Sequence, residues 1–182
     1  MRRICFLTII ISIFAGTFLN AQTARECCAK EWEEVIEVMK EDYPHLTRVK
    51  VLAIALKTEQ PSPSIEINCL EIDLEVILCR LYVTEAMIIV LTAEEFLAVI
   101  AHEIGHVANK DFETEDPTKR SFTVEKRADR FALVALKRLS ITSHVFISAL
   151  EKLTPKDDMN AQKEKKQRIE TIKLFEKNRK SN

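Results

Sequence analysis

The chain has 182 residues, with 27 basic and 28 acidic side chains and a formal net charge of -1. This balance excludes a strongly basic nucleic-acid-binding protein, and a hydrophobic content of 47% excludes an acidic disordered chain. The only glycines are Gly16 and Gly105, so neither a glycine-rich phosphate loop nor a dinucleotide fingerprint can be built. So few glycines also disfavour a β-sandwich with many tight turns. These exclusions leave a helix-rich globular domain.

The N-terminus has the features of a targeting segment. Two arginines precede an apolar run over residues 4–19, and Ala21 ends the run as a small residue. This pattern is typical of a secretory signal peptide that is cleaved after Ala21. The alternative is an uncleaved anchor, although the run is shorter than the roughly 20 apolar residues that span a bilayer. We expect residues 1–21 to be a signal peptide, residues 22–182 to form one domain, and the protein to be secreted or periplasmic.

Four cysteines follow the expected signal peptide, namely Cys27, Cys28, Cys69 and Cys79. An even number of cysteines in an oxidising compartment favours disulfides. Adjacent cysteines rarely bridge each other, so two bridges would join the N-terminal pair to Cys69 and Cys79. The alternative is buried free thiols, because the spacing alone fixes no connectivity.

The first half of the expected domain predicts one helix followed by strands. Apolar residues repeat at helical spacing from Trp32 to Met39, which predicts a helix over residues 25–42 that Pro44 ends. Apolar runs and alternation with polar residues then predict several short strands, separated by a proline-containing turn at residues 60–64. The predicted strands cover residues 49–56, 65–69, 72–76 and 78–84.

The second half of the chain predicts helices. Thr92 and Glu95 form a capping box that begins a helix running to about Asn109. Periodic apolar residues predict further helices over residues 123–139 and 141–153 and from residue 161 onward. The last helix is amphipathic with a basic bias, which is typical of a solvated outer face and allows at most peripheral membrane contact. The elements together indicate an α+β fold, in which a small, mainly antiparallel sheet packs beside two helices that carry the functional residues.

The segment His102-Glu103-Ile104-Gly105-His106 is the most informative part of the sequence. On a helix, His102 and His106 share one face a turn apart, so both imidazoles can bind one metal ion, and zinc suits nitrogen ligands. Glu103 lies beside the first histidine, within reach of a metal-bound water. Apolar neighbours on most sides predict a buried helix, where histidines and a glutamate need a partner. Gly105 costs about 1 kcal/mol relative to alanine in mid-helix, which close approach of another backbone would explain. The alternative is two ordinary polar residues on a helix surface.

A third ligand is expected downstream. Glu125 follows His106 by 19 residues, which allows a turn and a second helix that packs back against the first. Glu125 and Asp129 share a face of that helix, and Ala128 is small enough to let the two helices approach. Glu125 would complete a two-histidine, one-glutamate set with an open position for water, the arrangement of a catalytic zinc site. Asp129 would accept a hydrogen bond from a ligating histidine and fix its tautomer.

These motifs carry a resemblance to a known family. The stretch from Leu81 to Leu136 resembles the gluzincin metallopeptidases, most closely the HtpX-like and CAAX-prenyl-protease-like family. The matching segments are Leu81–Thr84, Leu97–Asn109 and Glu125–Arg130. A weaker similarity extends over Ala149–Leu153. A weaker resemblance to the ImmA-like metallopeptidases rests on the Glu-x-x-Ala pattern.

The resemblance implies a zinc site and a way of binding substrate. It implies that His102, His106 and Glu125 bind zinc and that Glu103 is the general base. It also implies that the strand around Tyr82 is a sheet edge over the cleft, which pairs with an extended peptide or protein substrate. The residues implied in substrate binding are Leu81, Tyr82 and Val83.

The sequence also departs from the family pattern. Family members often have a downstream His-Pro pair or an arginine that stabilises the oxyanion, and the comparable place here is Thr154-Pro155. Arg168, His144 and Tyr82 are the remaining candidates for that role. The function indicated is a secreted zinc metalloendopeptidase. It resembles the catalytic core of the HtpX-like family without the membrane-spanning helices. The alternatives are a non-catalytic zinc-binding pseudo-peptidase that acts through a protein partner, and a structural domain without metal.

Overall fold

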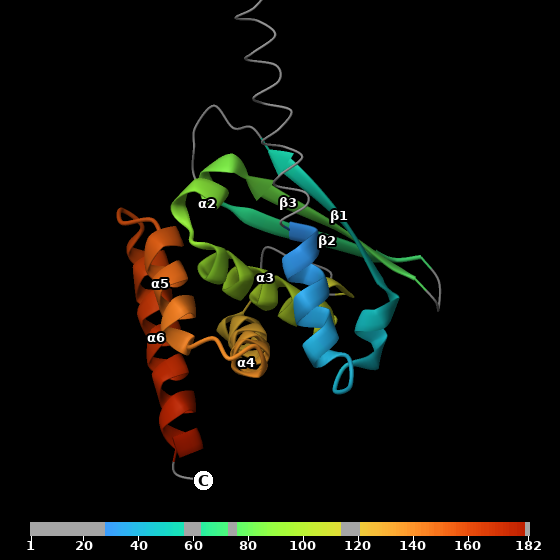
Figure 1. The fold of residues 1–182 in the computed structure, drawn as a ribbon. Helices are drawn as coiled ribbons and strands as arrows, with labels where there is room; N and C mark the ends of the chain where they lie inside the picture. The colour runs from blue at the N-terminus through green and yellow to red at the C-terminus, as the bar shows by residue number, and fades with distance from the viewer. Residues whose placement is uncertain (1–27, 57–62, 73–75, 114–120, 181–182) are drawn as a thin grey trace, which may run out of the picture.

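The computed structural model describes residues 28–56, 63–72, 76–113 and 121–180, and within these ranges the protein has an α+β fold, as predicted (Figure 1). The chain begins with a helix over residues 28–39 and the short 3-10 helix η1 (Pro44–Arg48). Three strands follow, β1 (Val49–Leu56), β2 (Ile65–Glu71) and β3 (Ile77–Thr84). The remaining elements are α2 (Glu85–Val90), α3 (Ala93–Ala108), η2 (Asp111–Glu113), α4 (Phe122–Arg138), α5 (Ser143–Leu153) and α6 (Met159–Lys180).

The sheet is mixed, and its strand order is β1-β3-β2. β2 and β3 form an antiparallel hairpin, whereas β1 pairs with β3 in the parallel direction. The predicted small sheet is confirmed, but it is mixed and not mainly antiparallel, because β3 inserts between β1 and β2 and pairs with β1 in the parallel direction. This order makes β3 the central strand and leaves β1 and β2 at the edges.

The strand predicted over residues 72–76 is wrong at both of its ends, because Ile72 and Val76 lie outside the strands. The Ile72 amide donates a 3.0 Å hydrogen bond to the Val76 carbonyl, which closes the connection between β2 and β3. The apolar alternation of β2 continues into this connection, so the pattern does not show where the strand ends. Residues 73–75, and most of the predicted turn at 60–64, lie outside the described residues.

A disulfide joins Cys69 of β2 to Cys79 of β3. The two residues are direct partners in the antiparallel register, and their Cα atoms are 4.1 Å apart. Cys28 is buried, and Cys27 lies outside the described residues. The expected bridges from the N-terminal pair to Cys69 and Cys79 are therefore wrong, because the strand register brings these two cysteines to each other.

The core lies between the sheet and the helices, with α3 at its centre (Figure 1). In β3, Ile77, Cys79, Leu81 and Val83 alternate with more exposed residues and are all buried against the helices. The helix over residues 28–39 adds Trp32, Val35 and Met39 to this core, which is the face that their spacing predicts. In the described ranges, none of the helices combines the length and the apolar character that a membrane crossing requires.

Candidate metal centre

α3 carries the segment from His102 to His106 and buries it inside the protein. Its N-terminus is fixed by the predicted capping box, in which the Glu95 amide donates to the Thr92 hydroxyl and the Glu95 carboxylate accepts from the Thr92 amide. Ten residues further along, His102, Glu103 and His106 are 7%, 7% and 2% exposed. These buried polar groups need partners, because desolvation without compensating contacts is costly.

α4 crosses α3 at Gly105 and brings a third acidic group to the two histidines. A Cβ atom on Gly105 would lie 2.9 Å from both the Cα and the carbonyl oxygen of Ala128. The expectation that another backbone approaches this glycine is confirmed. Glu125 lies one turn before Ala128 on α4, so the close crossing carries its carboxylate over His102 and His106.

The three expected ligand groups converge on one point. The Nε2 atoms of His102 and His106 are 3.2 Å apart, and the Glu125 carboxylate lies 3.2 Å from the first and 3.5 Å from the second. Nitrogen and oxygen ligands about 2.0–2.2 Å from a tetrahedral zinc ion would be about 3.3–3.6 Å from each other. The spacing of the donor atoms therefore fits a zinc ion, with a fourth position left for water or substrate.

Both histidines are oriented by buried aspartates. Asp129 Oδ1 lies 2.9 Å from His102 Nδ1, the contact expected from the sequence, and Asp111 Oδ2 lies 3.0 Å from His106 Nδ1. Each aspartate places the proton of its imidazole on Nδ1 and leaves the Nε2 lone pair directed at the metal position.

Asp111 was not identified from the sequence. Lys110 adopts a φ of 57°, and this left-handed residue reverses the chain after α3 so that η2 returns Asp111 to His106. Arg127 of α4 donates a 2.6 Å hydrogen bond to the other oxygen of Asp111. The only sequence signal for this role is an acidic residue shortly after the motif, and no glycine marks the turn that brings it back.

Arg168 of α6 completes the charged surroundings. Its Nε and Nη2 atoms donate to the two carboxylate oxygens of Asp129 at 2.9 and 2.5 Å, and its Nη1 lies 3.3 Å from Glu125. Burial raises the pKa of Glu125, but the hydrogen bond and charge of His102 and the charge of Arg168 outweigh burial and lower this pKa to about 2.

The pKa of His102 shifts in the opposite direction. Burial and the charge of Arg168 lower this pKa, but the hydrogen bonds with Asp129 and Glu125 outweigh them and raise it to about 9. His102 in the metal-free site therefore carries a proton at neutral pH, which a metal ion has to displace.

A cleft of about 310 Å³ opens beside the metal position. Glu103 lines it together with His102, Glu125 and Arg168. Its apolar wall comes from α3, α5, β2, α6 and the segment that joins α5 to α6, and consists of Val99, Phe146, Leu150, Leu153, Ile65, Ala161 and Pro155. The ring of Phe146 lies 5.9 Å from that of His102, so this apolar surface adjoins the expected ligands.

Three residues expected to bind substrate do not lie at an edge. Leu81, Tyr82 and Val83 belong to β3, which pairs with β1 on one side and with β2 on the other. Their backbone groups are used within the sheet, and the side chains of Leu81 and Val83 are buried. The expectation of a substrate-pairing edge at these residues is therefore wrong, because the edge strand that reaches the cleft is β2.

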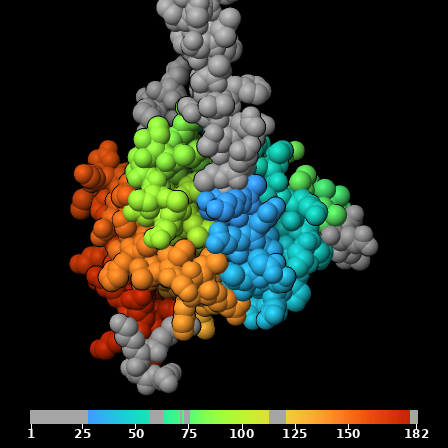
Figure 2. Space-filling model, viewed as in Figure 1, coloured from blue at the N-terminus to red at the C-terminus, as the bar shows by residue number. Residues whose placement is uncertain are grey.

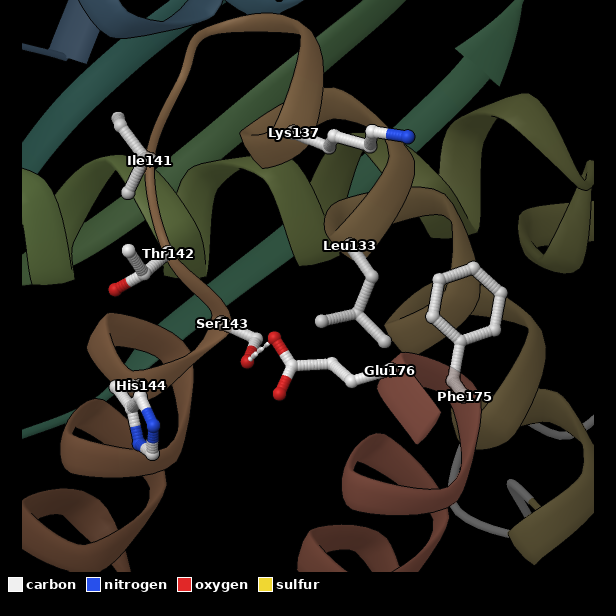
Figure 3. Close-up of a pocket in the computed structure, with 8 residues that line it drawn as sticks. All are labelled: Leu133, Lys137, Ile141, Thr142, Ser143, His144, Phe175 and Glu176. Atoms are coloured by element: carbon white, nitrogen blue, oxygen red, sulfur yellow. Dashed lines mark hydrogen bonds between the residues drawn. The ribbon is translucent and has the colours of Figure 1, made fainter. Parts of the chain in front are cut away.

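Of the three candidates for oxyanion stabilisation, Arg168 lines the cleft and the other two do not. His144 lines a separate cavity of about 420 Å³ between α4, α5 and α6, shown in Figure 3. In that cavity the hydroxyl of Ser143 donates a hydrogen bond to Glu176. Tyr82 lies in the central strand.

Comparison with known proteins gives one match. Residues 78–117 match the model of peptidase family M48, and this range includes β3 from its second residue onward and the whole of α3. The resemblance to HtpX-like zinc metallopeptidases is confirmed. The matched range supports a metal-binding peptidase and ends before Glu125, whose position is known here from the structure. No curated protein and no solved structure matches this chain significantly.

Proposed function

We propose that the protein is a zinc metalloendopeptidase in which His102, His106 and Glu125 bind the metal. The observation that carries this proposal is the convergence of the three donor groups at 3.2–3.5 Å, with each imidazole held by its own aspartate. A structural zinc site would have a fourth protein ligand, whereas this set leaves one position open towards a cleft.

The side chains of the cleft have distinct roles in this proposal. Bound zinc would polarise the scissile carbonyl and lower the pKa of a water molecule. Glu103 lines the cleft and takes the proton of the attacking water, then passes it to the leaving amine. Arg168 holds Asp129 and Glu125 in place, and its Nη1, which does not bind Asp129, is the group available to a substrate oxygen.

The substrate proposed is an extended peptide or protein segment that pairs with β2. β2 uses one edge to pair with β3, and its first residue, Ile65, lines the cleft. An added strand would form main-chain hydrogen bonds along the other edge. The buried side chains of Val99, Phe146 and Leu150 beside the metal position favour an apolar substrate residue next to the scissile bond.

Export from the cytoplasm is part of the proposal and rests on the sequence. Residues 1–21 have the charge and apolar pattern of a segment that directs secretion, whether they are removed afterwards or retained as an anchor. They lie outside the residues that the structure describes. Edman sequencing of the exported protein distinguishes these outcomes, because cleavage after Ala21 gives an N-terminus at Gln22.

Metal content and peptide cleavage test the proposal together. The purified protein should hold about one zinc ion per chain, and His106→Ala should lose it. His144→Ala is the matched control, because this histidine is on a different cavity and its loss should leave the zinc content unchanged. A wild-type protein that binds no zinc after reconstitution would rule out the metal centre.

Glu103→Gln separates a peptidase from a zinc-binding protein that acts only through a partner. The substitution preserves the shape of the side chain and removes the base, so zinc content and thermal stability should change little. Peptide cleavage should fall by at least about 100-fold, the scale for loss of a general base. Wild-type cleavage rates in Glu103→Gln would refute the mechanism, and a partner-dependent effect that survives the substitution would favour the pseudo-peptidase.

A further inference from the structure

The end of the molecule formed by α2 exposes large apolar side chains. Ile89 is 81% exposed, which is the highest value among the large apolar side chains that the structure describes, and Val90 is 41% exposed. Leu56, 37% exposed, ends β1 and pairs with Thr84, the N-cap residue of α2. Leu56 therefore lies at the end of the sheet from which α2 continues, and we call Leu56, Ile89 and Val90 the α2 patch.

Buried contacts on the inner face of α2 and a hydrogen bond from α5 fix the position of the α2 patch. Met87, on the opposite face of α2, is fully buried in the core, and Ala86 is 9% exposed. The ammonium group of Lys152 on α5 donates a 3.3 Å hydrogen bond to the carbonyl of Val90. The apolar side chains are therefore presented outward by a helix that is fixed to both β3 and α5. Apolar groups that cluster on a surface in this way mark a contact with a partner or a membrane.

The N-terminal part of the chain indicates which of these covers the α2 patch. The helix over residues 28–39 begins on the side of the molecule where α2 lies and runs away from it (Figure 1). Figure 2 shows the surface of α2 close to the beginning of the described chain. The apolar run over residues 4–19 precedes this point, and the nine residue-to-residue steps from Leu19 to Cys28 can span at most about 30 Å. A bilayer that holds the apolar run therefore lies close to this end of the domain.

We propose that the α2 patch rests in the interface of the lipid bilayer to which residues 4–19 tether the chain; this rests on their retention as the uncleaved anchor. A patch of three residues binds lipid weakly by itself, and a short tether raises its effective concentration at the bilayer surface. The contact sets the orientation of the domain and goes beyond peptide hydrolysis, because none of the three residues lines the catalytic cleft.

Tryptophan placed in the α2 patch reports the lipid contact directly. The full chain with Ile89→Trp is reconstituted in phosphatidylcholine vesicles whose acyl chains carry bromine, which quenches tryptophan fluorescence at short range. Leu174→Trp is the matched control, since Leu174 is 59% exposed and lies in the half of α6 that is far from α2. The native Trp32 is 2% exposed and contributes the same background to both variants.

The expected result is loss of most of the added fluorescence for Ile89→Trp and none for Leu174→Trp. Val90→Trp should behave as Ile89→Trp does, which provides a second reporter if one variant folds poorly. Absence of quenching at both α2 positions, or equal quenching at Leu174, would overturn the proposal. Concentration-dependent dimerisation without lipid that Ile89→Glu abolishes would assign the patch to a second copy and would also overturn it. Zinc content and peptide cleavage of the same variants in solution keep this test separate from that of the peptidase function.

Discussion

Gly105→Ala tests whether the crossing of α3 and α4 sets the geometry of the metal centre. The new Cβ would lie 2.9 Å from the Cα and the carbonyl oxygen of Ala128, whereas ordinary contacts begin at 3.4 Å. The helices would therefore have to separate by about half an ångström, and neither of the two atoms belongs to a flexible side chain. Because α4 carries Glu125, this shift also moves the carboxylate away from His102 and His106.

Two opposing effects determine how Gly105→Ala changes the free energy of unfolding. Overpacking of a tight contact costs about 1–3 kcal/mol, and alanine in mid-helix returns about 1 kcal/mol relative to glycine. Because the two crowded atoms belong to the Ala128 backbone, we expect overpacking to cost about 2–3 kcal/mol of this range. The net loss is then about 1–2 kcal/mol, which lowers the melting temperature of a domain of this size by about 2–8 °C. Thermal unfolding monitored by circular dichroism measures this change, and titration against a chelator measures the accompanying loss of zinc affinity.

A second variant makes the test specific. The clash involves the Ala128 backbone, so Ala128→Gly in the same chain should not restore stability or zinc affinity. Restoration by that variant would show that the Ala128 side chain causes the conflict. A Gly105→Ala protein that melts at or above the wild-type temperature and binds zinc equally well would refute the account of the crossing.

Three further predictions concern other contacts of the fold. Asp111→Ala should weaken zinc binding by about 10–100-fold in a chelator titration, because His106 loses the group that orients it, and unchanged affinity would contradict that role. Glu95 has a pKa lowered to about 2, since its contacts with Lys152, Ser148 and the Thr92 amide outweigh its burial. Because the pKa is lower in the folded state, this stabilisation is present above about pH 4.5 and is lost as the pH falls towards 2. The melting-temperature difference between wild type and Glu95→Gln should shrink over that range, and a constant difference would exclude the ion pair as its cause. Reducing the cystine in the β2–β3 hairpin should lower the free energy of unfolding by about 2–4 kcal/mol in denaturant titrations, and Cys69→Ser should no longer respond to reductant.

The sequence predicted those parts of the fold that are encoded locally. The capping box and the apolar periodicity identify α3, and the same periodicity with Glu125 and Asp129 on one face identifies α4. The helix α2 was not predicted, because its six residues are too few for a helical period and continue the apolar character of β3.

The parts that could not be predicted depend on contacts between distant segments. The insertion of β3 between β1 and β2 decides which strands lie at the edges of the sheet. The residues of β3 do not indicate which strands pair with it. The same register decides that Cys69 meets Cys79. Asp111 reaches His106 through a left-handed residue that is not glycine, so neither composition nor spacing indicates its role.

The formal charges around the two imidazoles give the metal centre a further property. Four carboxylates and two guanidinium groups surround them, namely those of Glu103, Asp111, Glu125, Asp129, Arg127 and Arg168. Four negative and two positive groups leave a formal charge of minus two, which a divalent cation balances. The proton that His102 holds with a pKa of about 9 balances only part of it. Metal uptake is therefore an exchange of a divalent ion against a proton, so the protein should release acid when it is loaded and lose its metal more readily as the pH falls.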